Sequence, residues 1–301
     1  MKNAINYYYN LYPVNIYQND RLYKFNVENT DYYLIPYNYD LKQLNIGYEL
    51  SKTLQQYNIY CHQIIENTKK ELSTIINERQ YVLLKTARYI DEKINLTNLM
   101  YYPLVTSSLH LETINHPKNW RELWMEKVDY FEYQVSNFKK KFSLIRETSS
   151  YYIGLAENGI QLLLEANNSY DYCVTHYRIK HYYTLFDLYN PLEFIIDSKI
   201  RDIAEYCKAQ FFNKDISLDE VIYCIDNNIL DRNQAILFFS RLLYPSYYFD
   251  LCDDIIYNNV SENSLSNIIN RSSDYEQFLS KINFYLHNQY QISEIEWLKK
   301  S

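Results

Sequence analysis

Residues 194–206 read Phe-Ile-Ile-Asp-Ser-Lys-Ile-Arg-Asp-Ile-Ala-Glu-Tyr and contain the most informative change of pattern in the chain. The short apolar run of residues 194–196 leads into Asp197, which is typical of a buried strand that ends on a carboxylate. Five residues later, Asp202 opens an amphipathic run that predicts a helix. We therefore expect Asp197 to be exposed at the end of a strand, where its hard oxygen atoms suit a magnesium ion.

A strand, a carboxylate and a helix in this order hold the magnesium ligand in kinase-like phosphotransferases. The segment that carries the catalytic base of such an enzyme lies upstream, and here it reads His176-Tyr177-Arg178. Position 178 requires an aspartate to accept the proton of the substrate, and arginine cannot accept one. The asparagine expected five residues further on is Tyr183. We interpret His176 and Arg178 as a degenerate catalytic loop and predict no catalytic residue.

The parts that would bind the phosphates of a nucleotide are also missing. A loop that covers phosphates usually needs glycine, but the expected turn at residues 18–20 has none, and its Asp20 would repel a triphosphate. The glycines of the chain, Gly47, Gly154 and Gly159, all lie in predicted helices. The third predicted strand, residues 31–37, lacks the lysine that would contact the phosphates.

The remaining polar residues of this region are interpreted as structural. Asp197 either retains metal binding or bonds the turn that follows it, and Asp202 either caps the next helix or anchors the loop that contains His176. Arg178 and Arg201 are expected to have structural roles. The guanidinium of Arg178 is expected to pair with Asp197 or Asp202, which would fill the place of a metal and lower the pKa of the carboxylate. His176 is expected to bond a backbone carbonyl. The one candidate metal ligand is thus Asp197.

The order of elements predicts an α+β, two-lobed protein-kinase-like fold. Strands are predicted at residues 14–17, 22–27, 31–37, 59–66, 72–76 and 81–84, with one helix capped by Asp40. Helices follow at residues 119–138, 151–165, 231–243, 246–257 and 274–288, with one more that begins at a capping box of Ser217 and Glu220. We predict a strand-rich N-terminal lobe at residues 1–88, a helical C-terminal lobe at residues 89–301, and a hinge near residues 85–89. Trp120 and Trp124 are assigned to the core.

Composition limits the classes of partner. The 301 residues include 30 Lys and Arg against 37 Asp and Glu, a net charge of −7, which argues against nonspecific binding to nucleic acid or to anionic membranes. The five cysteines form no Cys-x-x-Cys pair, so neither a zinc site nor a disulfide framework is predicted. No apolar run approaches the roughly 18–20 residues of a membrane span, and the N-terminus lacks a signal core, which predicts a cytoplasmic protein.

Tyrosine is unusually common, with 36 residues. One interpretation of this tyrosine-rich composition is drift in an AT-rich coding sequence, because Asn and Ile are abundant too. The other is that exposed tyrosines serve packing or cross-linking in an assembled layer, because Tyr combines a large contact area with a polar tip. Sequence alone leaves both interpretations open.

Three blocks carry a family resemblance: Trp120-Arg-Glu-Leu-Trp124 followed by Asp129 and Glu132, residues 151–160 (Tyr-Tyr-Ile-Gly-Leu-Ala-Glu-Asn-Gly-Ile), and residues 197–206. They resemble, in the same order, the blocks of bacterial spore coat proteins of the YutH type, within the aminoglycoside/choline-kinase-like superfamily. The third block departs from the family pattern Asp-His-Pro-Ser-Arg-Asp-Ile-Ala-Glu-Tyr at Ser198, Lys199 and Ile200. The resemblance implies an aminoglycoside phosphotransferase-like fold and a sporulating Gram-positive source.

It further implies synthesis in the cytoplasm of the mother cell and assembly into the spore coat beside other coat proteins. We predict a pseudokinase with a binding or structural role, no cofactor, and no nucleic-acid or membrane partner. The alternative is an unorthodox ATP-dependent small-molecule phosphotransferase that takes Mg-ATP, with Asp197 as metal ligand and Asp187 or His176 as base. A third interpretation is a cytosolic scaffold unrelated to sporulation.

Overall fold

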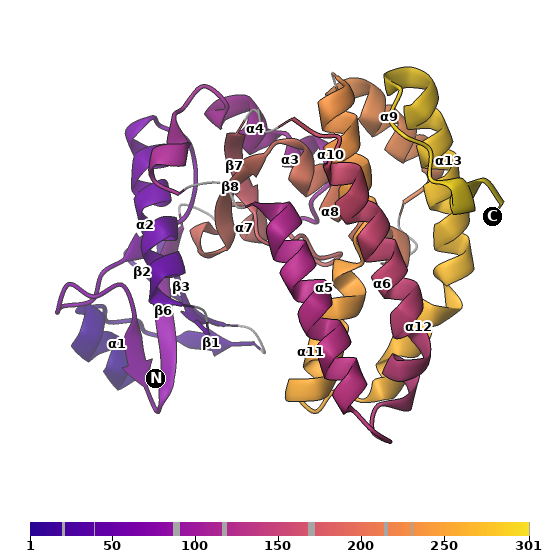
Figure 1. Ribbon diagram of the computed structural model, residues 1–301. Coiled ribbons are helices and arrows are strands. Elements are labelled where there is room, and N and C mark those ends of the chain that lie inside the picture. Colours follow the sequence, from indigo (N-terminus) through magenta and orange to yellow (C-terminus); the bar gives the residue numbers. More distant parts are fainter. Residues whose placement is uncertain are drawn as a thin grey trace. The chain divides into compact units, whose positions relative to one another are not determined.

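The computed structural model describes residues 1–19, 22–38, 40–86, 91–115, 119–167, 172–213, 216–229 and 231–300 (Figure 1). The chain divides into two compact units, one of residues 1–117, 172–177 and 182–196, the other of residues 118–171, 178–181 and 197–301. The lobe boundary at residue 88 and the hinge near residues 85–89 stay predictions, because residues 87–90 lie outside the described part. The same holds for Asp20 of the expected phosphate-covering turn.

An antiparallel six-stranded sheet is the centre of the first unit, and its strands are β1 (Ile16–Gln18), β2 (Tyr23–Val27), β3 (Thr30–Pro36), β4 (Gln63–Ile65), β5 (Thr74–Ile76) and β6 (Arg79–Thr86). The strands are hydrogen-bonded in the order β1-β2-β3-β6-β4, with β5 also paired to β6. Tyr33 lies opposite Leu84, and Leu34 lies opposite Leu83. Because side chains alternate along a strand, these two pairs face opposite sides of the sheet, and both sides are buried.

A helix covers each face of this sheet. Helix α2 (Leu41–Gln56), capped by Asp40 as predicted, packs Leu44 against Tyr33 and Leu84. On the other face α1 (Lys2–Tyr9) buries Ile5 and Tyr9 against Leu34 and Leu83. The first unit also contains the short helices α3 (Leu96–Leu99), α4 (Tyr101–Thr106) and α7 (Leu185–Leu188), and 3-10 turns at Leu111–Thr113 and Pro191–Glu193. Two further strands, β7 (Tyr172–His176) and β8 (Phe194–Ser198), pair with each other. The last two residues of β8, Asp197 and Ser198, belong to the second unit.

The second unit is built from helices: α5 (Trp120–Asn137), α6 (Ser143–Leu163), α8 (Ile200–Asn213), α9 (Leu218–Asn228), α10 (Arg232–Leu243), α11 (Ser246–Tyr257), α12 (Ser266–Asn270) and α13 (Ser272–Tyr290), with 3-10 turns at Glu262–Leu265 and Glu296–Lys300 (Figure 1). Helix α10 packs against α6, α8 and α13, so it lies in the core of this unit. Its residues 234–243 are all buried, including Arg241.

Most predicted elements are present, with shifted ends. The capping box of Ser217 and Glu220 begins α9 as predicted, while α6 starts at Ser143, eight residues before the predicted start at residue 151. All five cysteines are free and buried, in agreement with the predicted lack of disulfides. In the described part of the chain, no helix is long and apolar enough to cross a membrane.

Candidate functional site

Asp197 is the fourth residue of β8 and is buried, with 5% of its surface exposed. The prediction of an exposed carboxylate was therefore wrong, because the strand does not end at the surface: all five residues of β8 are buried, and α8 follows at once. The backbone N–H of Ser198, the last residue of this strand, donates to Oδ1 of Asp197 at 2.7 Å. A bond from Asp197 to the turn that follows the strand stays a prediction.

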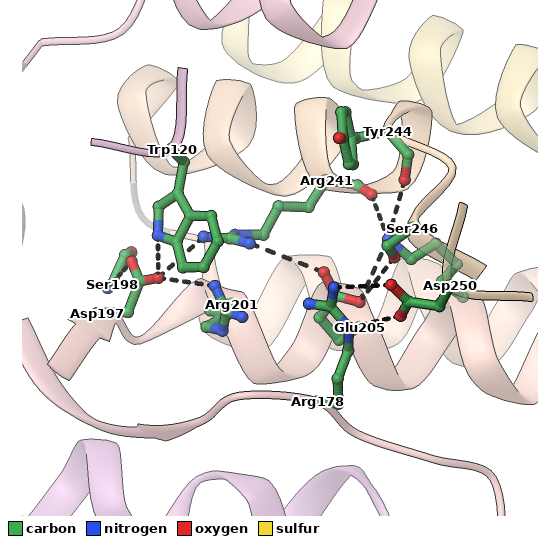
Figure 2. A network of polar contacts seen from close by, with 11 residues as sticks. Trp120, Arg178, Asp197, Ser198, Arg201, Glu205, Arg241, Tyr244, Ser246 and Asp250 are labelled. Atoms are coloured by element: carbon green, nitrogen blue, oxygen red, sulfur yellow. Dashed lines mark hydrogen bonds and ion pairs between the residues drawn. The ribbon is translucent and has the colours of Figure 1, made fainter. Parts of the chain in front are cut away.

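The other oxygen of Asp197 is the meeting point of three helices of the second unit (Figure 2). Its Oδ2 accepts hydrogen bonds from Nη1 of Arg201 on α8 and from Nη2 of Arg241 on α10, each at 2.9 Å. Nε1 of Trp120, the first residue of α5, donates to the same oxygen. Arg201 is fully buried and Arg241 almost so, which makes these charge-assisted bonds in a site with little water.

Trp120 also supports both guanidinium groups. The Cζ atoms of Arg201 and Arg241 lie 4.2 and 4.8 Å from the centre of its ring, within the range of cation–π attraction. Trp124 is buried and stacks on Tyr244 with ring centres 4.2 Å apart. The assignment to the core is therefore right for Trp124 but incomplete for Trp120, which is a stacking platform for two arginines.

A second buried carboxylate, Glu205, extends the network (Figure 2). Its Oε1 lies 3.7 Å from Nη1 of Arg241, and its Oε2 lies 3.3 Å from Nζ of Lys208. Lys208 also donates to the carbonyl oxygens of Arg241, at 2.8 Å, and of Tyr244, at 3.1 Å. Because these carbonyls belong to the last turn of α10 and the residue after it, the buried lysine also caps the end of that helix.

The charges of this network shift one another's protonation. Burial acts to raise the pKa of Glu205, but the positive charges of Lys208, Arg178, Arg201 and Arg241 outweigh it and lower that pKa to about 2. Burial lowers the pKa of Lys208 to about 8, although Glu205 opposes that shift. The carboxylate is thus held in its charged form at neutral pH.

Arg178, which the sequence predicts to lie where a base is missing, makes a bidentate pair with Asp250 of α11, with Nε–Oδ2 at 2.8 Å and Nη2–Oδ1 at 3.3 Å. This partner was not considered from sequence, and pairing of Arg178 with Asp197 or Asp202 stays a prediction. Asp202 is the third residue of α8 and is buried, so it is not the N-cap, which corrects one of its two predicted roles. Its role as an anchor of the loop that contains His176 also stays a prediction.

The two bases proposed for the alternative mechanism lie in the first unit and are both bonded. His176 ends β7, is fully buried, and its Nε2 makes the predicted bond to a backbone carbonyl, that of Leu188, at 2.8 Å. Oδ2 of Asp187 accepts from the backbone N–H and the hydroxyl of Thr184, at 2.9 and 3.1 Å, in the capping box of α7. Each bond stabilises the local backbone.

The donors around Asp197 do not fit a magnesium ion. Magnesium requires hard oxygen ligands in octahedral geometry, whereas Oδ2 of Asp197 already faces two guanidinium groups and an indole N–H. A divalent cation beside Arg201 and Arg241 would place four positive charges around one carboxylate oxygen. Nowhere in the described ranges do three His, Cys, Asp or Glu side chains form a group that could hold a metal.

Sequence reasoning missed Arg241, Glu205 and Lys208. A usable signal was the placement of charged residues on faces that the apolar pattern assigns to the core. Arg241 precedes Leu242 and Leu243 in a helix that is buried throughout its last ten residues. Such positions are occupied by charged residues almost only when they are paired.

Comparisons with known proteins bear on both the family and the fold. A model of the family described as "Spore coat putative kinase YutH" matches residues 2–282. The endospore coat-associated protein YutH of Bacillus subtilis (strain 168) is 26% identical over 213 residues. That alignment covers 60% of this chain and 61% of the relative, so the chain spans about three fifths of the length of the curated relative it matches.

Two solved structures show the fold. An aminoglycoside phosphotransferase from Alicyclobacillus acidocaldarius subsp. acidocaldarius DSM 446 is similar with a TM-score of 0.63 at 8% identity, covering 93% of this chain and 94% of that one. The choline kinase LicA from Streptococcus pneumoniae is similar with a TM-score of 0.55 at 10% identity, covering 93% and 97%. The prediction of a kinase-like, aminoglycoside phosphotransferase-like fold is confirmed.

Proposed function

Because this chain belongs to the YutH family of spore coat proteins and has a kinase-like fold, we propose that it is a spore coat component that uses this fold for binding or assembly and not for phosphoryl transfer. The observation that carries the proposal is the engagement of Asp197 by Arg201, Arg241 and Trp120. In a kinase-like enzyme the carboxylate at this place holds magnesium and, through it, the nucleotide phosphates.

The cost of restoring a metal at Asp197 supports this proposal. To bind magnesium, the carboxylate would have to release Arg201 and Arg241, both of which are buried. Breaking a buried ion pair leaves an uncompensated charge and typically costs about 3–5 kcal/mol. The network is thus more stable with its internal cations than with an external one.

The position of the missing base gives independent support. Arg178 cannot accept a proton, and it is bound to Asp250. His176 and Asp187, the candidate bases of the alternative, are held by Leu188 and Thr184. These bonds give both residues a structural role within the first unit.

A phosphotransfer assay tests the proposal. Purified protein is incubated with Mg-ATP and a panel of aminoglycosides, amino alcohols and sugars, with an active aminoglycoside phosphotransferase as positive control. We expect no phosphorylated product above the background without protein. Turnover that disappears in the Asp197→Asn variant would contradict the proposal and establish the alternative, an ATP-dependent small-molecule phosphotransferase.

The coat role is tested separately, in sporulating cells. A fluorescently tagged copy should be made in the mother cell and then gather around the developing spore. It should remain with the coat fraction when mature spores are extracted, which is expected if other coat proteins are its partners. A uniform cytosolic signal through growth and sporulation would contradict this role and favour the scaffold interpretation.

A further inference from the structure

Helix α5 carries an exposed stripe on the side opposite its core contacts. Its buried residues are Trp124, Val128, Phe131 and Gln134. The exposed stripe runs through Glu122, Glu126, Asp129 and Tyr133, at the spacings of four, three and four that line one face of a helix. Three successive turns therefore present acids, and the next presents a tyrosine.

Apolar side chains flank the acids of this stripe. Tyr133 is 68% exposed, and Leu123, Met125 and Tyr130 are exposed on neighbouring positions of the helix. The hydroxyl of Tyr130 lies 3.0 Å from that of Tyr257 on α11, which holds the edge of the stripe in place. Large exposed apolar side chains on both flanks of an exposed stripe are typical of an interaction surface.

The stripe ends in a basic turn. Lys139, Lys140 and Lys141 follow Phe138, the C-cap of α5, and are exposed. The rings of Phe138 and Phe142 contact each other with centres 5.0 Å apart. Lys139 and Phe142 both have left-handed backbone conformations, with φ of 51° and 53°. Among the described residues, the side chains of these lysines and of Glu126 and Asp129 have no ion-pair partner.

Acids at one end of the stripe, lysines at the other and Tyr133 between them make this surface complementary to itself under a two-fold rotation. We propose that the exposed stripe of α5 joins two copies of this chain in a symmetric dimer, with the two α5 helices antiparallel and crossing near Tyr133. In that arrangement the acids of the stripe of one copy, which lie N-terminal to Tyr133, face the basic turn that follows α5 of the partner. Each such contact occurs twice.

Charge complementarity is the reason to choose a second copy as the occupant. The chain has a net charge of −7, so two copies repel unless basic groups meet acidic ones, and the antiparallel arrangement brings them together. Tyr133 and Tyr130 would supply the contact area near the axis. The inference uses none of the residues around Asp197 and therefore stands apart from the proposed function.

Sedimentation velocity with charge-reversal variants tests the arrangement. Reversal of the basic turn (K139E/K140E/K141E) and reversal of the acids (E122K/E126K/D129K) should each raise the dimer dissociation constant at least about tenfold. In the variant that carries both sets of substitutions, the dimer dissociation constant should return to within about threefold of the wild-type value, because the ion pairs are restored with exchanged signs. The control variant K69E/K70E changes two lysines that are also exposed, and it should leave the dimer dissociation constant unchanged. A circular dichroism melt of each variant checks that it folds.

A cysteine at the proposed axis gives a second readout. The native cysteines are all buried, so a short bismaleimide reagent should react mainly with an introduced thiol. Tyr133→Cys should give a cross-linked dimer in high yield, and Tyr223→Cys, at a site 70% exposed on α9, should not. A wild-type chain that stays monomeric at high concentration, species larger than a dimer, equal cross-linking of the two variants, or failure of the double reversal to restore association would each overturn the proposal.

Discussion

Arg201 and Arg241 donate to one oxygen of Asp197 and lie over one tryptophan ring, so two like charges share a small buried volume. Burial and the nearby Arg201 lower the pKa of Arg241 to about 10, while Asp197 and Glu205 oppose that shift. The negative charges of Asp197 and Glu205 and the face of the Trp120 ring offset the repulsion between the two buried arginines. The stability of the second unit should therefore depend on each member of the network.

Asp197→Asn removes the charge of the carboxylate with little change of shape. We expect a loss of about 3 kcal/mol in the free energy of unfolding, because two buried guanidinium groups lose their shared counter-ion. Urea denaturation measures it, and Asp254→Asn on the exposed side of α11 is the matched control, with an expected change below about 0.5 kcal/mol. Equal effects of the two substitutions would show that the network does not stabilise the fold.

The lowered pKa of Glu205 makes the free energy of unfolding depend on pH. Its pKa is lowered from 4.5 to about 2 in the folded chain, where nearby cations outweigh the effect of burial. Because the unfolded chain takes up this proton first, the stabilisation from Glu205 is complete above about pH 5 and is lost as the pH falls toward 2. The loss is on the order of 3 kcal/mol.

Urea denaturation between about pH 2 and pH 6 measures this loss. The Glu205→Gln variant should lose less stability than the wild type across that window, since it has no proton to take up at this site. Parallel curves for the two proteins would contradict the lowered pKa.

Sequence distance explains which members of this site could be predicted. Arg201 lies four residues after Asp197, across the short turn between β8 and α8, so this contact is local in the sequence. Arg241 is 44 residues away from Asp197, and Trp120 is 77 residues away. No local pattern reports such contacts, and for the same reason the burial of Asp197 could not be foreseen.

At the scale of elements, two glycines of α6 lie in different surroundings: one is in close contact with α10, and the other has free space around it. A Cβ atom on Gly159 would lie 2.9 Å from the carbonyl oxygen of Ser240 and 3.3 Å from the backbone nitrogen of Tyr244, so α6 approaches the end of α10 closely there. A Cβ atom on Gly154 would meet nothing within 4 Å. The same substitution should thus have opposite effects at the two sites.

Gly159→Ala should destabilise the protein by about 1–3 kcal/mol, because backbone atoms of α10 must move. Gly154→Ala should stabilise it by up to about 1 kcal/mol through helix propensity alone. Thermal denaturation of the two variants beside the wild type distinguishes them. Stabilisation by both would show that α6 and α10 are not in close backbone contact.

Whether a helix could be predicted depends on whether the interactions that stabilise it are local in the sequence. Helices α2 and α9 begin at side-chain caps, Asp40 and Ser217, which are visible in the sequence. Helix α1 was not predicted, because it has no acid in its first turn and no side-chain cap. It is held instead by Ile5 and Tyr9, which pack against the sheet, and that stabilisation becomes visible only in the folded chain.

At the scale of the whole molecule, a kinase-like fold does not by itself determine the chemistry of the site. The aminoglycoside phosphotransferase and the choline kinase named above share this fold at 8% and 10% identity, which leaves the residues of the site free to differ. Here the sequence predicts Arg178 at the place of the base, and Asp197 is bound by arginines. The order of strands and helices was predictable because many residues determine it, whereas the state of the site depends on a few distant contacts.

The central claim, that internal arginines and not a magnesium–nucleotide complex occupy Asp197, is tested most directly by the melting temperature with and without Mg-ATP. A ligand present at a hundredfold excess over its dissociation constant stabilises the folded state by about 2.7 kcal/mol. For a chain of this length that corresponds to a rise of roughly 4 °C. We predict no rise with Mg-ATP, with ATP alone or with magnesium alone. A rise that requires both ATP and magnesium would contradict the account, because it would mean that a working nucleotide site remains.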